Sequence, residues 1–152
     1  MLKVDQVIGT YRVVSQLGGG GCATVWRARH IHLESDHALK VLREELVSRS
    51  DLRWRFLDEG RVQAQLRHPG IVRVTDIVVE PGLAGLVMDF IEGPSLTQLL
   101  AERGGQGLSR GEVLAIASGL FDALHFAHEH GVVHRDIKPG NLVLTKDHRG
   151  RL

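Results

Sequence analysis

The sequence predicts an α+β fold, in which a small antiparallel sheet with one helix precedes a helical region. Two observations predict it. Short β-rich runs separated by glycine or proline turns occupy most of residues 11–91, with one helical stretch among them. From Glu92-Gly93-Pro94 onward, apolar residues recur at helical spacing. The pattern therefore changes from β-rich to helical close to Gly93.

Five strands are expected in the first part, at residues 11–17, 24–29, 37–42, 71–79 and 83–91. A helix is expected between the third and fourth strands, at about 51–67, with Ser50 as its cap. His68-Pro69-Gly70 ends this helix, because proline cannot continue a helix and glycine tolerates the turn.

Two helices are expected in the second part. Ser95 caps a short helix that runs to about residue 103, and Ser109 with Glu112 forms a capping box before a longer helix that Gly131 ends. The apolar stripe of the longer helix consists of Val113, Ile116, Ala117, Leu120, Phe121, Leu124 and Ala127. We expect domains at 1–92 and 93–152, joined by a connector at 89–93.

Composition excludes several classes of function. A chain of 152 residues is long enough to bury a core, and 19 basic against 18 acidic residues argue against nucleic-acid binding. The single cysteine, Cys22, excludes an intrachain disulfide and a cysteine-based zinc cluster, which favours a cytoplasmic location. No apolar run approaches bilayer length, so no membrane segment is expected.

The most specific motif is residues 134–141, His-Arg-Asp-Ile-Lys-Pro-Gly-Asn. It places a carboxylate, an ammonium and an amide on one loop, the groups that phosphoryl transfer needs for the nucleophile's proton, the γ-phosphate and Mg²⁺. The run resembles the catalytic loop of eukaryotic-like, bacterial-type protein serine/threonine kinases. The resemblance implies that Asp136 accepts the substrate proton, Lys138 steadies the γ-phosphate and Asn141 binds Mg²⁺. The alternative is a surface loop without function.

A glycine-rich turn lies between the first two expected strands, in the run Leu17-Gly18-Gly19-Gly20-Gly21-Cys22-Ala23-Thr24-Val25. Without Cβ atoms the backbone can approach phosphates and direct its N–H groups at them. The run resembles the kinase loop G-x-G-x-x-G-x-V, with Ala23 in place of the third glycine, and implies that these nine residues bind ATP. A flexible hairpin turn would explain the glycines equally well.

The third expected strand contains Ala38-Leu39-Lys40, which resembles the kinase strand Val-Ala-Ile-Lys. The resemblance implies that Ala38 leaves room for the base and that Lys40 reaches the α- and β-phosphates. Glu59, on the expected helix, is the best match to the carboxylate that orients this lysine. Taken singly, Lys40 and Glu59 would be read as solvated surface charges.

Residues 86–93 resemble the last strand and the connector of the kinase nucleotide site. The resemblance implies that Met88 lines the pocket and that Asp89 and Ile91 offer backbone contacts to adenine. A core strand followed by an exposed turn is the alternative.

The resemblance runs from about Tyr11 to Leu144 and implies a protein-kinase-like fold and a serine/threonine protein kinase that uses ATP and Mg²⁺ on protein substrates. No Asp-Phe-Gly follows the loop, so we expect a kinase-domain fragment with impaired activity. Self-association through the exposed helical surface is also expected. A non-catalytic nucleotide-binding or regulatory module is the main alternative. An aminoglycoside-type small-molecule kinase is disfavoured by Lys138-Pro139, which belongs to the protein-kinase pattern.

Overall fold

The computed structural model describes residues 2–145 and 150–151, which form two compact units. The first unit contains the described residues of Met1–Gln65 together with Arg73–Phe90. The second unit contains Leu66–Val72 together with the described residues of Ile91–Leu152. Leu66–Val72, which the sequence pattern places in the first part, therefore packs within the second unit.

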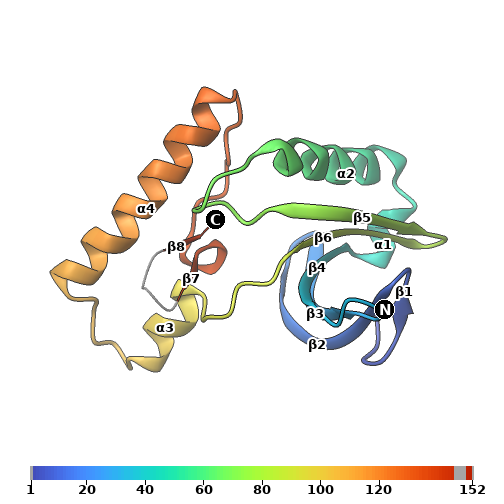
Figure 1. Ribbon diagram of the computed structural model, residues 1–152, viewed down its shortest axis with the longest axis horizontal. Coiled ribbons are helices and arrows are strands. Elements are labelled where there is room, and N and C mark those ends of the chain that lie inside the picture. The colour runs from blue at the N-terminus through green and yellow to red at the C-terminus, as the bar shows by residue number, and fades with distance from the viewer. Residues whose placement is uncertain (1, 146–149, 152) are drawn as a thin grey trace. The chain divides into compact units, whose positions relative to one another are not determined.

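The first unit is built on a six-stranded antiparallel sheet (Figure 1). Its strands are β1 (Val7–Ile8), β2 (Tyr11–Gly20), β3 (Ala23–His30), β4 (Asp36–Leu42), β5 (Val74–Glu80) and β6 (Leu83–Asp89), in the spatial order β1-β2-β3-β4-β6-β5. The prediction of an α+β fold is confirmed, but the count of five strands was one short. The missed strand, β1, has only two residues, which is too short for alternation to reveal.

The two faces of the sheet are covered differently, because successive strand side chains point to opposite sides. One face buries a cluster that includes Trp26, Ala28, Leu39, Val41 and Val87. On the other face, Phe56 and Leu57 of helix α2 (Ser50–Gln65) pack with Val74 and Leu86, and the short helix α1 (Glu44–Val47) adds Val47. Figure 1 shows α2 running along β5.

Gly60 determines how closely α2 can approach the sheet. It is buried, and a Cβ atom added there would overlap the side chain of Leu86. A glycine inside a helix lowers helix propensity by about 1 kcal/mol, so close packing against β6 offsets a local cost. The N-terminus of α2 differs slightly from expectation, since Ser50 is its first helical residue rather than its cap.

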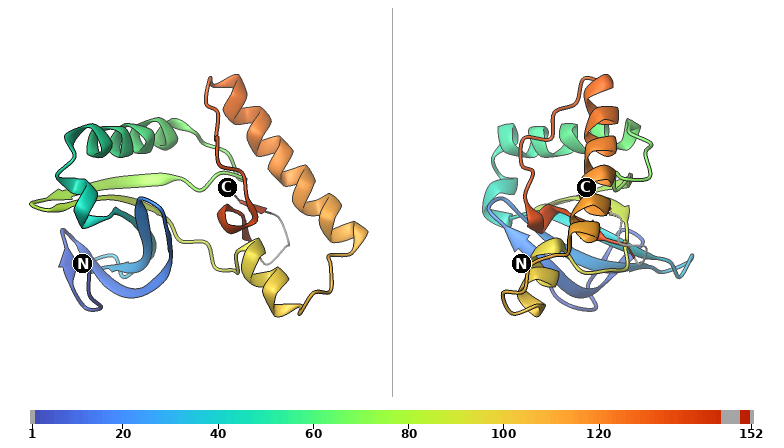
Figure 2. Two further views of the ribbon diagram at one scale, coloured as in Figure 1. Left: turned by 180° about the vertical axis from the view of Figure 1, so that it is seen from behind. Right: turned by 90° about the vertical axis from the view of Figure 1, so that its left-hand side faces the viewer.

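The second unit consists mainly of helices (Figure 2). Its elements are α3 (Leu96–Glu102), α4 (Arg110–Glu129), the 3₁₀ turn η1 (Pro139–Asn141), β7 (Val143–Leu144) and β8 (Gly150–Arg151). Both predicted N-caps are confirmed: Ser95 accepts a hydrogen bond from the Gln98 N–H and Ser109 accepts one from the Glu112 N–H. Gly131 has a φ of +73°, the left-handed conformation that glycine commonly adopts just after the end of a helix. None of the helices in the described ranges is long and apolar enough to cross a bilayer.

The apolar stripe of α4 was predicted only in part. Ile116 and Ala127 are buried as expected, but Val113 is 48% exposed and Phe121 is 67% exposed. Ala123, absent from the expected stripe, is fully buried with Ala127 in a cluster that includes Leu66 and Ile71. Because an alanine adds little to a hydrophobic pattern, the sequence did not reveal that the face of α4 with Ala123 packs against Leu66–Val72.

Candidate functional site

The segment that follows the loop at 134–141 is fixed to the start of α3 by backbone hydrogen bonds. The Leu96 N–H donates to the Leu142 carbonyl at 2.8 Å, and the Leu144 N–H donates to the Pro94 carbonyl at 2.9 Å. A Cβ atom added at Gly93 would overlap the Leu144 carbonyl oxygen, so the two segments approach closely only because this residue is glycine.

Within the loop, Lys138 and Asn141 converge on Asp136. The Lys138 Nζ donates to Asp136 Oδ2 at 2.7 Å, while the Asn141 Nδ2 donates to the same oxygen at 3.0 Å and to the Asp136 carbonyl at 2.8 Å. The turn η1 brings Asn141 back towards Asp136, since the Asn141 N–H donates to the Lys138 carbonyl. Arg135 has a φ of +62°, a left-handed conformation that a non-glycine residue rarely adopts. The three residues predicted from the sequence thus form one hydrogen-bonded group.

The electrostatics of this group keep Asp136 ionised. The hydrogen bond from Lys138, followed by that from Asn141, lowers the pKa of the Asp136 carboxyl below its usual value. The Asp136 side chain remains 62% exposed, so it is accessible from solvent. A carboxylate of low pKa is a weak base, so a group of this kind is better suited to orient a neighbouring hydroxyl than to remove its proton unaided.

The arrangement suits a Mg²⁺ ion that arrives with a nucleotide. Asn141 uses its amide nitrogen for both contacts, which leaves its amide oxygen as a ligand of the type that Mg²⁺ prefers. Among the residues that the structure describes, no group of three histidine, cysteine, aspartate or glutamate side chains is placed to hold a metal ion. Magnesium commonly binds one or two protein oxygens together with substrate phosphates, so the residues present fit such an ion.

The glycine-rich turn joins β2 to β3 in the first unit. Gly18 pairs with Val25 and Gly20 pairs with Ala23, so the glycines continue the strand. None of the four glycines at 18–21 has a left-handed φ, and added Cβ atoms at Gly18, Gly20 and Gly21 would meet nothing within 4 Å. The fold therefore does not require glycine at these three positions. Glycine at these positions would let a phosphate come close to the backbone.

Lys40 lies on β4, on the same face of the sheet as Ala38, and pairs across the strands with Val25. Its Nζ lies 5.8 Å from the centroid of the Phe56 ring on α2. The expected partner, Glu59, is exposed on α2 and makes no ion pair with Lys40. The structure therefore places Lys40 as the sequence suggested but does not bring it together with Glu59.

The connector begins at the end of β6. Met88 is half-buried and pairs with Ala38, and the Asp89 N–H donates to the Arg73 carbonyl at 3.0 Å. Ile91 is the half-buried residue at which the second unit resumes. Sequence reasoning missed a neighbour of this region, Arg27 of β3, whose guanidinium lies 5.0 Å from the centroid of the Phe90 ring. The sequence could have indicated Arg27, because it is a charged residue two positions after Val25 and therefore on the same face of the predicted strand.

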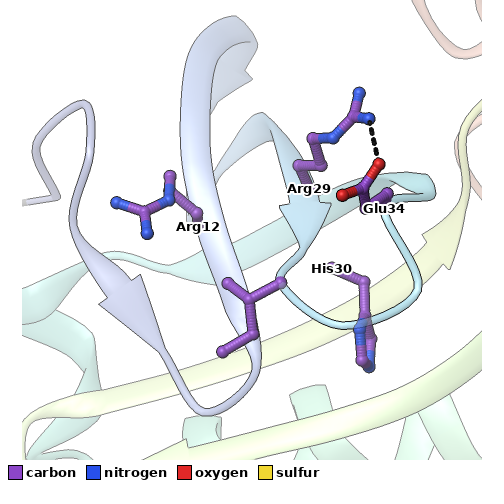
Figure 3. Close-up of a pocket in the computed structure, with 5 residues that line it drawn as sticks. Arg12, Arg29, His30 and Glu34 are labelled. Atoms are coloured by element: carbon purple, nitrogen blue, oxygen red, sulfur yellow. Dashed lines mark ion pairs between the residues drawn. The ribbon is translucent and has the colours of Figure 1, made fainter.

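A shallow pocket of about 160 Å³ lies at the opposite end of the β2–β3 hairpin from the glycine-rich turn (Figure 3). It is lined by Arg12, Arg29, His30, Ile31 and Glu34. Arg29 and Glu34 form an exposed ion pair at 3.6 Å across its rim. The pocket contains none of the residues that the sequence predicted for the site.

A β-rich unit with a glycine turn and a strand lysine, followed by a helical unit with an Asp-Lys-Asn loop, defines the kinase-like class of proteins. The sequence profile of the protein kinase domain matches residues 11–152, and the chain belongs to that family.

Curated relatives are bacterial serine/threonine-protein kinases. The chain is 43% identical to PkaA of Streptomyces coelicolor, over 90% of this chain and 27% of that protein. It is 39% identical to PknF of Mycobacterium tuberculosis, over 89% of this chain and 28% of that protein. The chain thus spans about a quarter of the length of these relatives.

Solved kinase domains share the fold. A double mutant of the Mycobacterium tuberculosis PknI kinase domain superimposes with a TM-score of 0.87 at 36% identity, covering 100% of this chain and 62% of that one. A further structure of the PknI kinase domain gives a TM-score of 0.81, covering 99% of this chain and 60% of that one.

Proposed function

We propose that this chain is part of a serine/threonine protein kinase that binds MgATP and transfers the γ-phosphoryl group to serine or threonine hydroxyls of protein substrates. The observation that supports it most is the convergence of Lys138 and Asn141 on Asp136. This convergence brings together on one loop the carboxylate, the ammonium and the amide that phosphoryl transfer needs.

Each group has a defined role in the proposed reaction. Asp136 orients the substrate hydroxyl and takes its proton as the oxygen bonds to the γ-phosphorus, while the bond from that phosphorus to the β,γ-bridging oxygen breaks and ADP leaves. Lys138 neutralises charge on the transferred group, and Asn141 holds Mg²⁺ through its amide oxygen. When bound, Mg²⁺ offsets the negative charge on the phosphate oxygens.

The first unit supplies the proposed phosphate contacts. The glycines at 18–21 carry no side chain that would keep a phosphate away from the backbone, and Lys40 on β4 adds a positive charge. Ala38 adds little bulk beside Met88, which leaves room for a flat base. These features support ATP as the donor.

The proposal is tested by titrating MgATP into the 152-residue chain and its Lys40→Met variant. Methionine keeps the bulk of the lysine stem but removes the charge, and a hydrogen bond to a charged group is worth about 1.5–3 kcal/mol, or about 10- to 150-fold in affinity. Lys3→Met, at an exposed lysine outside the sheet, is the matched control and should bind like the unmodified chain. Equal affinities for all three proteins would remove Lys40 from the site.

The alternative of a non-catalytic nucleotide-binding module is not favoured, because the relatives are named kinases and the loop residues are intact. We further propose that the isolated chain self-associates through the exposed α4 surface formed by Val113, Leu114 and Phe121. A cytoplasmic location is proposed on the single, exposed cysteine, Cys22, and on the use of MgATP.

A further inference from the structure

Arg27 takes part in an arrangement that the proposed reaction does not use. Its guanidinium lies 2.6 Å from Asp36 Oδ2 and 5.0 Å from the centroid of the Phe90 ring. The side chains of Arg27 and Asp36 are 40% and 24% exposed, so water screens this pair only in part. The carboxylate thus holds the guanidinium in place against the ring, where a cation–π interaction is favourable.

The register of the sheet places Arg27 on the side assigned to the nucleotide. Arg27 pairs with Ala38 across β3 and β4, and Ala38 pairs with Met88 across β4 and β6. Cross-strand partners point to the same face, so Arg27 shares the face of Ala38 and Lys40. Its neighbours Trp26 and Ala28 point into the core on the opposite face.

Phe90 is the first residue after the end of β6, where the backbone no longer pairs with a neighbouring strand. The ladder between β4 and β6 ends at the pair His37–Asp89, and residues 90–94 belong to no strand or helix. Side-chain contacts therefore have a larger share in fixing this backbone than they have inside a strand. Arg27 reaches the first residue of that segment.

We propose that Arg27, held by Asp36, is a positioning residue for recognition of the purine base: it fixes the Phe90 ring and with it the adjacent Asp89 peptide group that adenine would contact. This inference rests on the proposed function. It assigns Arg27 to the affinity for the base and not to the affinity for the phosphates, which the glycine-rich turn and Lys40 provide.

The test compares MgATP with magnesium tripolyphosphate in titrations of the 152-residue chain. Arg27→Gln should weaken MgATP binding about five-fold, the loss expected for a partly exposed cation–π contact, and leave tripolyphosphate binding unchanged. Phe90→Leu should give a similar loss, and the double variant should be no weaker than the weaker single variant, because both remove the same contact. Arg27→Lys should retain part of the affinity.

Arg29→Gln is the matched control, because Arg29 is the next residue on the same strand face and pairs with Glu34 (Figure 3). It should bind MgATP normally. Normal binding by both Arg27→Gln and Phe90→Leu, or an equal loss for MgATP and tripolyphosphate, would overturn the inference. If Arg27→Gln does not fold, the MgATP affinities of Phe90→Leu and Phe90→Trp are compared instead. Phe90→Trp keeps an aromatic ring and should keep the affinity, whereas Phe90→Leu should lose it. Absence of MgATP binding by the unmodified chain would instead overturn the proposed function.

Discussion

Gly93→Ala should release the segment that follows the loop at 134–141 from the start of α3. The new Cβ atom would overlap the Leu144 carbonyl oxygen, a backbone atom that cannot rotate away. The hydrogen bonds from Leu144 to Pro94 and from Leu96 to Leu142 would then break. At about 0.5–1.5 kcal/mol each, the two bonds together account for about 1–3 kcal/mol of local stability.

Hydrogen exchange is the suitable assay. A loss of 1–3 kcal/mol corresponds to about 5- to 150-fold faster exchange, and the affected amides should be those of Leu96 and Leu144. Tryptophan fluorescence would miss the change, since both tryptophans, Trp26 and Trp54, lie in the first unit. Circular dichroism at 222 nm should show a lower melting temperature for the second unit.

Gly111→Ala provides the control for this substitution. Gly111 lies in α4, and its added Cβ would meet nothing within 4 Å, so alanine should leave stability unchanged or raise it slightly. Unchanged exchange of Leu96 and Leu144 in Gly93→Ala would refute the reasoning, because it would mean that the two segments tolerate a side chain at their closest approach.

Three further predictions follow from the site and from α4. The 152-residue chain should transfer little labelled phosphate from MgATP to a generic serine/threonine substrate, because its sequence has no Asp-Phe-Gly aspartate; robust turnover that Asp136→Asn abolishes would contradict this. Hydrogen bonds from Arg103 and then Ser109 lower the pKa of Glu112 from 4.5 to about 2, so the stability that ionised Glu112 contributes is full above its unfolded pKa and is lost as the pH falls from about 4.5 to about 2. In Glu112→Gln, the free energy of unfolding should therefore depend less on pH in that window. An unchanged pH dependence of the free energy of unfolding would mean that Glu112 does not cause it. Phe121→Ser should reduce binding of a hydrophobic dye and self-association of the chain, measured by fluorescence and sedimentation, whereas Ala115→Ser, at an exposed position of α4, should change neither.

Local signals were strong enough to predict most elements of the fold. The two N-caps at Ser95 and Ser109 depend on side chains three residues from their partners, so sequence spacing alone specifies them. The residues of the catalytic loop were predicted for the same reason, because Asp136, Lys138 and Asn141 lie within six consecutive residues. The two-residue strand β1 escaped detection because it offers no period to read.

Contacts between residues distant in sequence could not be predicted in this way. The burial of Ala123 depends on Leu66 and Ile71, more than fifty residues earlier, and an alanine signals neither a core nor a surface position. The close approach of Gly93 to Leu144 is similarly invisible until the chain has folded.

By itself, the sequence determined the family, the order of the elements and the identity of the loop residues, because motifs and caps are local in the chain. Only the tertiary structure decided which side chains meet: it gathered Lys138 and Asn141 on Asp136, left Lys40 beside Phe56 without Glu59, and brought Arg27 to Phe90. The physical reason is that these contacts depend on strand register, helix rotation and turn geometry, which the packing of the whole unit sets.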